Sequence, residues 1–173
     1  MTATAERLLA RAPLPPLGDV LEFMRVVWAV DHALQRTSKQ MARSLGVTGP
    51  QRFVIRIVAR FPGIPAGDLA RLLHVHPSTL TGILARLERF GLIRRRTDPR
   101  DRRRSLLGLT ERGRRFDVST EGTVEAAVER ALRGMPPARI QAAREVLKSL
   151  AGSLADAPAV RASRTSRAAV RRR

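Results

Sequence analysis

The 173-residue chain contains no cysteine, and Lys39 and Lys148 are its only lysines. Without cysteine, the protein forms no disulfide, no thiolate metal site and no thiol redox switch. No apolar run approaches the roughly 20 residues that a membrane-spanning helix needs, and the first residues lack the apolar core of a signal peptide. We therefore expect a soluble, cytoplasmic protein that has no contact with a membrane.

Catalytic and metal-binding patterns are also missing. The three histidines are His32, His74 and His76, and the last two, only two residues apart, do not share a helix face. Zinc usually takes four ligands, and no carboxylate cluster accompanies this pair. The chain has no glycine-rich phosphate loop and no nucleophile motif. We expect no enzyme activity, no metal and no cofactor, and we interpret His74 and His76 as surface or capping residues.

Arginine dominates the charged residues that are present. Basic residues number 33 against 15 acidic ones, which gives a formal net charge of +18. Residues 86–104 hold nine arginines and three acidic residues, and residues 161–173 hold six arginines and no acid. Arginine suits phosphate and guanine because it binds both in bidentate geometry. A codon bias toward arginine is the alternative, but the clustering favours a nucleic acid partner.

Apolar periodicity predicts a long amphipathic helix within residues 17–46, ended by Gly46. A proline-rich arm, residues 1–16, precedes it and is expected to be flexible. Residues 110–156 predict two more amphipathic helices, the first running from Thr110 to Leu132. No predicted sheet covers the apolar stripes of these three helices, which indicates dimerisation regions and a homodimer. Residues 157–173 lack periodicity and predict a basic, disordered tail.

Between the dimerisation regions, residues 47–109 predict three short helices and a β-hairpin. Thr48 and Gln51 form a capping box at the start of the first helix. Pro77 suits the first turn of the third helix and Gly91 its left-handed end. Arginine-rich runs on both sides of Asp98-Pro99 then form the hairpin. The fold class is therefore mainly α with a small β-hairpin wing: a winged helix-turn-helix DNA-binding domain with an α-helical dimerisation region.

These segments resemble the MarR family of bacterial transcription regulators. The resemblance runs through three stretches, Val47–Val58, Gly67–Ile93 and Arg94–Gly113, and covers roughly residues 18–155 in order and spacing. It implies an obligate homodimer that presents two winged domains to double-stranded DNA. In such proteins the recognition helix reads the major groove and the wing-tip arginine enters the minor groove.

Two short motifs carry the resemblance near the wing. The family's wing motif, Asp-x-Arg-x-x-Arg, corresponds to Asp98, Arg100 and Arg103. Its helix-start motif, Leu-Thr-x-x-Gly, corresponds to Leu109, Thr110 and Gly113. The chain departs from the family at Gly82, where a larger polar or basic residue often faces DNA. This departure leaves the base contacts near Gly82 open.

The residues predicted to contact DNA lie on the third helix and the wing. Short hydroxyl side chains at a helix start can bond phosphates or base edges, and the helix dipole favours a phosphate there. Arg100 is the first choice for the minor groove, whose potential is most negative in narrow A·T-rich segments. The predicted DNA-binding set is Ser78, Thr79, Thr81, Arg86, Arg100, Arg102 and Arg104. The alternatives are that the hydroxyls only cap the helix and that Arg86 pairs with Glu88.

Acidic residues in the wing would repel DNA unless they were occupied. We therefore interpret Asp98 and Asp101, with Arg103, as structural supports of the wing. The resemblance also implies a small-molecule effector pocket between the dimer helices and the winged domain. Its candidate lining residues are Trp28, Asp31, His32, Arg52 and Phe53. The alternative places Trp28 and Phe53 in the dimer core and Arg52 in solvent.

The leading hypothesis is a ligand-responsive repressor that binds a pseudo-palindromic operator as a homodimer. An effector weakens DNA binding only if it prefers the geometry in which the recognition helices are wrongly spaced. The alternative is a nucleoid-associated architectural protein that coats DNA by charge alone, through the wing and the tail. Specificity over random DNA and the salt dependence of binding separate the two. A capped, hydroxyl-lined recognition helix favours the first, because coating DNA does not need one.

Overall fold

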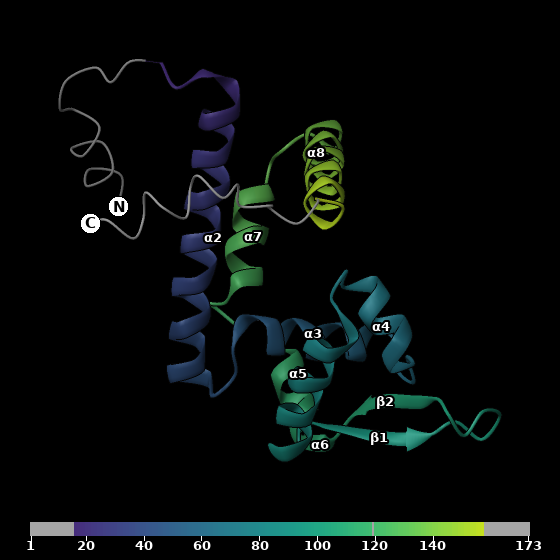
Figure 1. Cartoon of the computed structure of the whole chain (residues 1–173). Coiled ribbons are helices and arrows are strands. Elements are labelled where there is room, and N and C mark those ends of the chain that lie inside the picture. The colour runs from purple at the N-terminus through teal and green to yellow at the C-terminus, as the bar shows by residue number, and fades with distance from the viewer. Residues whose placement is uncertain (1–15, 119, 158–173) are drawn as a thin grey trace, which may run out of the picture. The chain divides into compact units, whose positions relative to one another are not determined.

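The computed structural model describes residues 16–118 and 120–157, which form two compact units divided after Val128. The elements are α2 (Gly18–Leu45), α3 (Gly49–Arg60), α4 (Ala66–Leu72), α5 (Pro77–Arg89), β1 (Ile93–Thr97), β2 (Ser105–Leu109), α6 (Glu111–Arg114), the 3₁₀ turn η1 (Arg115–Asp117), α7 (Val124–Leu132) and α8 (Pro137–Ala155) (Figure 1). Helix α8 belongs to the second unit. The expected arm and tail lie outside the described residues, apart from residues 16 and 157. No helix in the described part is both long and apolar enough to span a membrane.

Local capping signals set the boundaries of the first helices, as predicted. Gly46 ends α2 in the left-handed region, at φ 75°. The Thr48 hydroxyl accepts the backbone N–H of Gln51, and the Gln51 side chain accepts that of Thr48, so the capping box is present. His76 caps α5, because its ring accepts the backbone N–H of Ser78. The capping interpretation of His76 is therefore confirmed.

The core of the first unit lies among α3, α4, α5 and the hairpin. Its members are apolar side chains that are almost fully buried: Val47, Val54, Ile55, Val58, Leu69, Ala70, Leu80, Leu84, Leu87, Leu92, Ile93, Leu107 and Leu109. On α5 the buried leucines recur at spacings of four and three, so one face of that helix packs inward and the opposite face stays exposed. This packing fixes α5 in the unit and leaves its polar face available to a partner.

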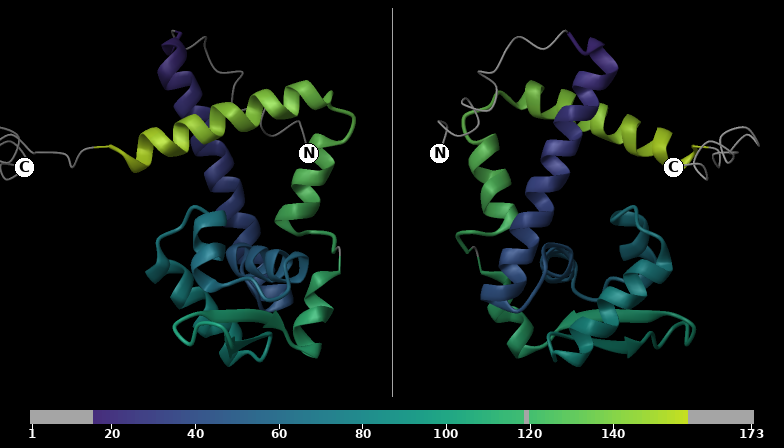
Figure 2. Two further views of the ribbon diagram at one scale, coloured as in Figure 1. Left: turned by 90° about the vertical axis from the view of Figure 1, so that its right-hand side faces the viewer. Right: turned by 60° about the vertical axis from the view of Figure 1, so that its left-hand side comes forward.

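The predicted hairpin is present as an antiparallel pair of strands. Ile93 pairs with Leu109 and Thr97 with Ser105, so the turn between the strands contains residues 98–104. The connection between α3 and α4 also bonds to β2: Gly63 N–H donates to the Leu107 carbonyl, and Leu107 N–H donates to the Ile64 carbonyl. Figure 2 shows the hairpin at the end of the first unit that lies farthest from the start of α2.

The prediction of one unbroken helix from Thr110 to Leu132 is wrong. Thr110 does cap a helix, but α6 ends at Arg114, and α7 starts only after Gly122, whose φ is 76°. Thr123 caps the new helix through the backbone N–H of Ala126. The left-handed conformation of Gly122 is one cause of the break. The other is that arginine side chains of α3 donate hydrogen bonds to the carbonyl oxygens of residues 116–118, which would accept backbone N–H groups in a continuous helix.

The long apolar stripe predicted for α2 is left largely uncovered in the described part of the chain. Met41 is the only residue of α2 that is buried, whereas Val20 is 73% and Trp28 is 78% exposed. Within the second unit, Leu147 and Leu154 of α8 are also exposed. Apolar faces of this length on a helix usually mark an interface.

Candidate nucleic-acid interface

All four residues of α5 that were predicted to contact DNA, Ser78, Thr79, Thr81 and Arg86, are exposed. The Ser78 hydroxyl lies 2.7 Å from Nδ1 of His76, and the Thr81 hydroxyl donates to the Pro77 carbonyl at 2.8 Å. Each of these two hydroxyls therefore already has a local partner at the helix start, but neither accepts a backbone N–H of the described residues, and His76 is the residue that caps α5. Both also face solvent, so each retains further hydrogen-bonding capacity for a partner.

Arg86 does not pair with Glu88. The Glu88 carboxylate instead accepts a hydrogen bond of 2.9 Å from Nε of Arg95 on β1. This ion pair joins the last turn of α5 to strand β1. It also means that Arg95, one of the three consecutive arginines 94–96, already has a partner within the protein. Arg86 has no ion pair within the described residues, and its exposed guanidinium projects from the same helix as the hydroxyls.

The two wing carboxylates bond to the backbone of the wing tip. Asp98 accepts the backbone N–H of Arg100 at 2.9 Å, and Asp101 accepts that of Arg103 at 3.0 Å. Asp101 also lies 3.6 Å from Nε of Arg103. These bonds shape the turn and leave the side chains of Arg100 and Arg102 exposed. Contact between these arginines and DNA stays a prediction.

Asp68 at the start of α4 is a wing support that sequence reasoning missed. Its carboxylate accepts a hydrogen bond from Arg71 and another, of 3.1 Å, from Arg104. The Arg71 hydrogen bond, aided by the charges of Arg71 and Arg104, holds the pKa of Asp68 below its ordinary value. The i,i+3 spacing of Asp68 and Arg71 is visible in the sequence. The link to Arg104 depends on tertiary structure, and it ties the wing to the helix-turn-helix.

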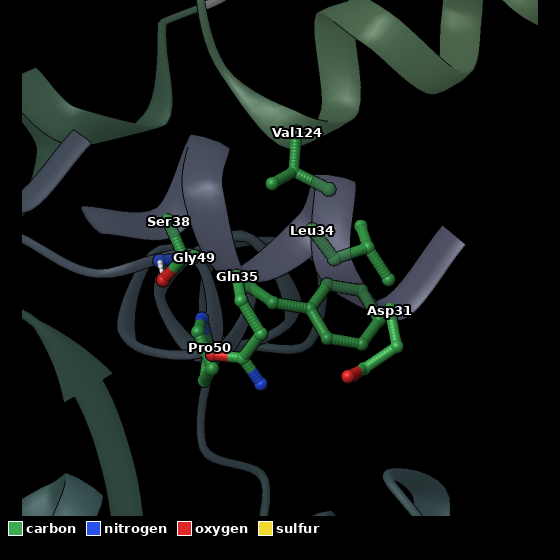
Figure 3. A pocket seen from close by; sticks show the side chains of 8 residues that line it. Asp31, Leu34, Gln35, Ser38, Gly49, Pro50 and Val124 are labelled. Carbon is green, nitrogen blue, oxygen red and sulfur yellow. Dashed lines mark hydrogen bonds between the residues drawn. The ribbon is translucent and has the colours of Figure 1, made fainter. Parts of the chain in front are cut away.

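A cavity of about 330 Å³ lies between α2, α3 and the start of α7. Its lining residues are Asp31, Leu34, Gln35, Ser38, Gly49, Pro50, Phe53 and Val124 (Figure 3). Asp31 and Phe53 were predicted to line a pocket; Trp28, His32 and Arg52 do not line this one. No group of three or more histidine, aspartate or glutamate residues in the described part of the chain could hold a metal ion.

Arg52 is buried, so the expectation that it lies in solvent is wrong, and it does not line the cavity described above. It is only 1% exposed. Its guanidinium donates to the carbonyl oxygens of Phe116 at 2.8 Å and Val118 at 2.7 Å, and to the carboxylate of Glu125. The fork of an arginine has the donors to satisfy three acceptors at once. Arg52 therefore fastens α3 to the segment that follows the wing.

One turn further along α3, Arg56 holds the same segment. It donates to the Asp117 carbonyl and, at 2.6 Å, to the Asp117 carboxylate. We call Arg52 and Arg56 the arginine clamp. The side chain of Arg56 is 39% exposed and that of Arg52 only 2%, so the Arg56 guanidinium is much the more solvated of the two.

Comparison with known proteins agrees with this architecture. The family model described as "MarR family" matches residues 47–105. Transcriptional regulator HosA of Escherichia coli O111:H- is 37% identical over 82 residues, which are 47% of this chain and 61% of that protein. Across HosA and two further regulators, the chain spans 45% to 61% of the relative's length.

A longer match identifies the family. HTH-type transcriptional repressor Mb2911 of Mycobacterium bovis is 30% identical over 117 residues, which are 68% of this chain and 80% of the repressor. Among solved structures, the S. aureus MepR–DNA complex has the same fold, with a TM-score of 0.64, 20% identity, and coverage of 76% of this chain and 97% of that one. The matched relatives are transcriptional regulators rather than enzymes, and this chain belongs to the MarR family.

Proposed function

We propose that the protein is a cytoplasmic, homodimeric repressor that binds a pseudo-palindromic DNA operator and responds to a small molecule. The observation that carries this proposal is the exposed polar face of α5 beside a wing whose tip arginines are held by carboxylates. A helix whose apolar face is packed and whose other face is small and polar suits the major groove. The repressor activity named for the Mycobacterium bovis relative, and the DNA bound to MepR, support it.

The uncovered apolar stripe of α2 supports the dimer. Val20, Met24 and Trp28 are each more than half exposed in the single chain, which is costly for apolar side chains in water. A second copy of the chain buries such faces economically, because a two-fold axis lets the same patch pair with itself. A symmetric dimer in turn matches a DNA site made of two inverted half-sites.

Arg100→Ala tests the DNA-binding role of the wing. An operator is first selected from random duplexes, and its affinity is then measured by fluorescence anisotropy at several salt concentrations. We expect the variant to bind the operator about tenfold to hundredfold more weakly, with a salt slope reduced by about one unit per wing. The matched control is Arg139→Ala, which removes an exposed arginine from α8 and should leave affinity nearly unchanged.

The result also decides between specific regulation and coating by charge. Equal affinity for the operator and for random duplex, or failure of the selection to enrich any sequence, would show that the protein is an architectural DNA-binding protein. Unchanged affinity in Arg100→Ala, with specificity retained, would remove Arg100 from the interface. Sedimentation of the protein without DNA tests the dimer separately, and a monomer at micromolar concentration contradicts the proposal.

A further inference from the structure

The cavity between α2, α3 and α7 differs in charge from the rest of the protein. Basic residues outnumber acidic ones 33 to 15 in the chain, yet among the described residues no basic side chain lines the cavity. Within residues 16–118 and 120–157, Asp31 is the only ionisable residue in the lining. The walls are mainly apolar: Leu34, Pro50, Phe53 and Val124. The cavity opens to solvent in the single chain, where Leu34 is 42% and Phe53 56% exposed, and its volume of about 330 Å³ is at the lower end of the range of small-molecule sites.

We propose that this cavity binds an organic cation with an apolar, aromatic body. The inference rests on the proposed response to a small molecule and names the chemical class of that molecule. The carboxylate of Asp31 supplies the opposite charge, and the face of the Phe53 ring attracts a cation through its quadrupole. Figure 3 shows Leu34 between Val124 and Asp31, and Pro50 beside Gln35, so polar and apolar groups both border the space that a ligand would enter.

An anionic ligand finds little in this cavity to bind it. The start of α3 lines the cavity, and helix starts attract anions through free backbone N–H groups. Here those groups are occupied or missing: Gly49 N–H donates to the Ser38 hydroxyl at 2.9 Å, Pro50 has none, and Gln51 N–H donates to Thr48. The remaining dipole is equivalent to about half a charge. An anion in the cavity would also meet the like charge of Asp31, with the Gln35 amide among the lining groups that can donate to it.

A set of three ligands with one apolar body tests the inference. The cation is (1-naphthylmethyl)trimethylammonium, the neutral isostere replaces its nitrogen by carbon, and the anion is 1-naphthylacetate. Calorimetric titration of the full chain measures each affinity. We expect the cation to bind about five- to tenfold more tightly than the neutral isostere, the gain that one exposed ion pair and one cation–π contact provide, and the anion to bind more weakly than both.

Asp31→Asn removes the charge with little change of shape, and Asp19→Asn on the same helix is the matched control. Asp31→Asn should make the cation and the neutral isostere bind equally, whereas Asp19→Asn should keep the preference for the cation. Thermal unfolding of both variants checks that the fold is retained.

Each other outcome overturns the inference. Equal binding of the cation and the neutral isostere by the unaltered protein leaves an apolar site without charge selection. If naphthylacetate binds most tightly, the site prefers anions rather than cations. If none of the three ligands binds, the cavity is not a binding site for organic cations of this kind. Operator affinity is measured on the same samples without ligand. Loss of operator binding there contradicts the proposed function itself, whereas intact operator binding with a failed ligand series contradicts only the cation.

Discussion

Replacing Arg52 by methionine should destabilise the protein by about 3 kcal/mol. Methionine keeps the length of the aliphatic stem but removes all three hydrogen bonds of the buried guanidinium. Breaking a buried ion pair by removing one partner costs about 3–5 kcal/mol, because the other charge is left uncompensated. Glu125 is 36% exposed and can be rehydrated, which places the expected cost at the lower end.

Urea denaturation measures this cost, and a fixed protein concentration keeps the contribution of the proposed dimerisation equal in all variants. For a chain of this size, 3 kcal/mol corresponds to a fall in Tm of about 6–12 °C. Arg56→Met is the matched control: it removes an arginine one turn away whose ion pair with Asp117 is partly solvated. That variant should lose only about 1 kcal/mol.

A double-mutant cycle isolates the ion pair itself. Glu125→Gln alone and in combination with Arg52→Met should reveal a coupling energy of about 1–2 kcal/mol, in the range expected for groups in direct contact. If Arg52→Met falls within 1 kcal/mol of the unaltered protein, the guanidinium does not anchor the segment that follows the wing. A coupling energy near zero would instead show that the cost of Arg52→Met comes from the lost hydrogen bonds to the carbonyl groups of Phe116 and Val118.

Three further predictions follow from single positions. Gly82→Ala should raise the free energy of unfolding, measured in urea, by about 0.5–1 kcal/mol. Glycine is a poor helix former, and a Cβ at this position meets nothing within 4 Å. A loss of stability would show that the added methyl group does not fit there. Gly113→Ala should cost about 1–3 kcal/mol, since its Cβ would lie 1.9 Å from the Leu92 carbonyl oxygen; a neutral result would show that the backbone yields easily. The lowered pKa of Asp68, held mainly by Arg71, means that its ion pairs are complete above the ordinary carboxyl pKa of about 3.9 and are lost as pH falls through the lower folded value. NMR titration of the Asp68 carboxyl group should show a midpoint below the ordinary value, and a midpoint at or above it would contradict the geometry.

Local signals explain why the helix-turn-helix and the wing could be predicted from the sequence. The capping box at Thr48, the proline at the start of α5 and the turn at Asp98-Pro99 each act within a few residues. Gly113, part of the short motif that carried the family resemblance, has a physical reason in the structure: no side chain fits beside the Leu92 carbonyl. Such features need no knowledge of distant contacts, so a sequence displays them directly.

The break between α6 and α7 could not be predicted in this way. Apolar spacing from Phe116 to Leu132 suits one helix, and Gly122 alone is a weak stop signal. The deciding contacts join α3 to residues more than 60 positions away, through Arg52 and Arg56. One signal was available: Arg52 precedes the buried Ile55 by three residues, so it lies beside the inward face of its helix. An arginine there needs buried partners.

The arginine clamp and the cavity share two short segments of the first unit. On α3, Arg52 belongs to the clamp and its neighbour Phe53 to the cavity; on α7, Val124 lines the cavity and Glu125 binds Arg52. Val124 and Glu125 are adjacent in the first turn of α7, so the cavity wall and the carboxylate that binds Arg52 belong to the same helical turn. Arg52 in turn fixes Phe116 and Val118, which directly follow the winged domain. The cavity and the clamp therefore use neighbouring residues on the same two helices, so Arg52→Met is the variant in which to measure whether a ligand in the cavity and DNA binding are coupled.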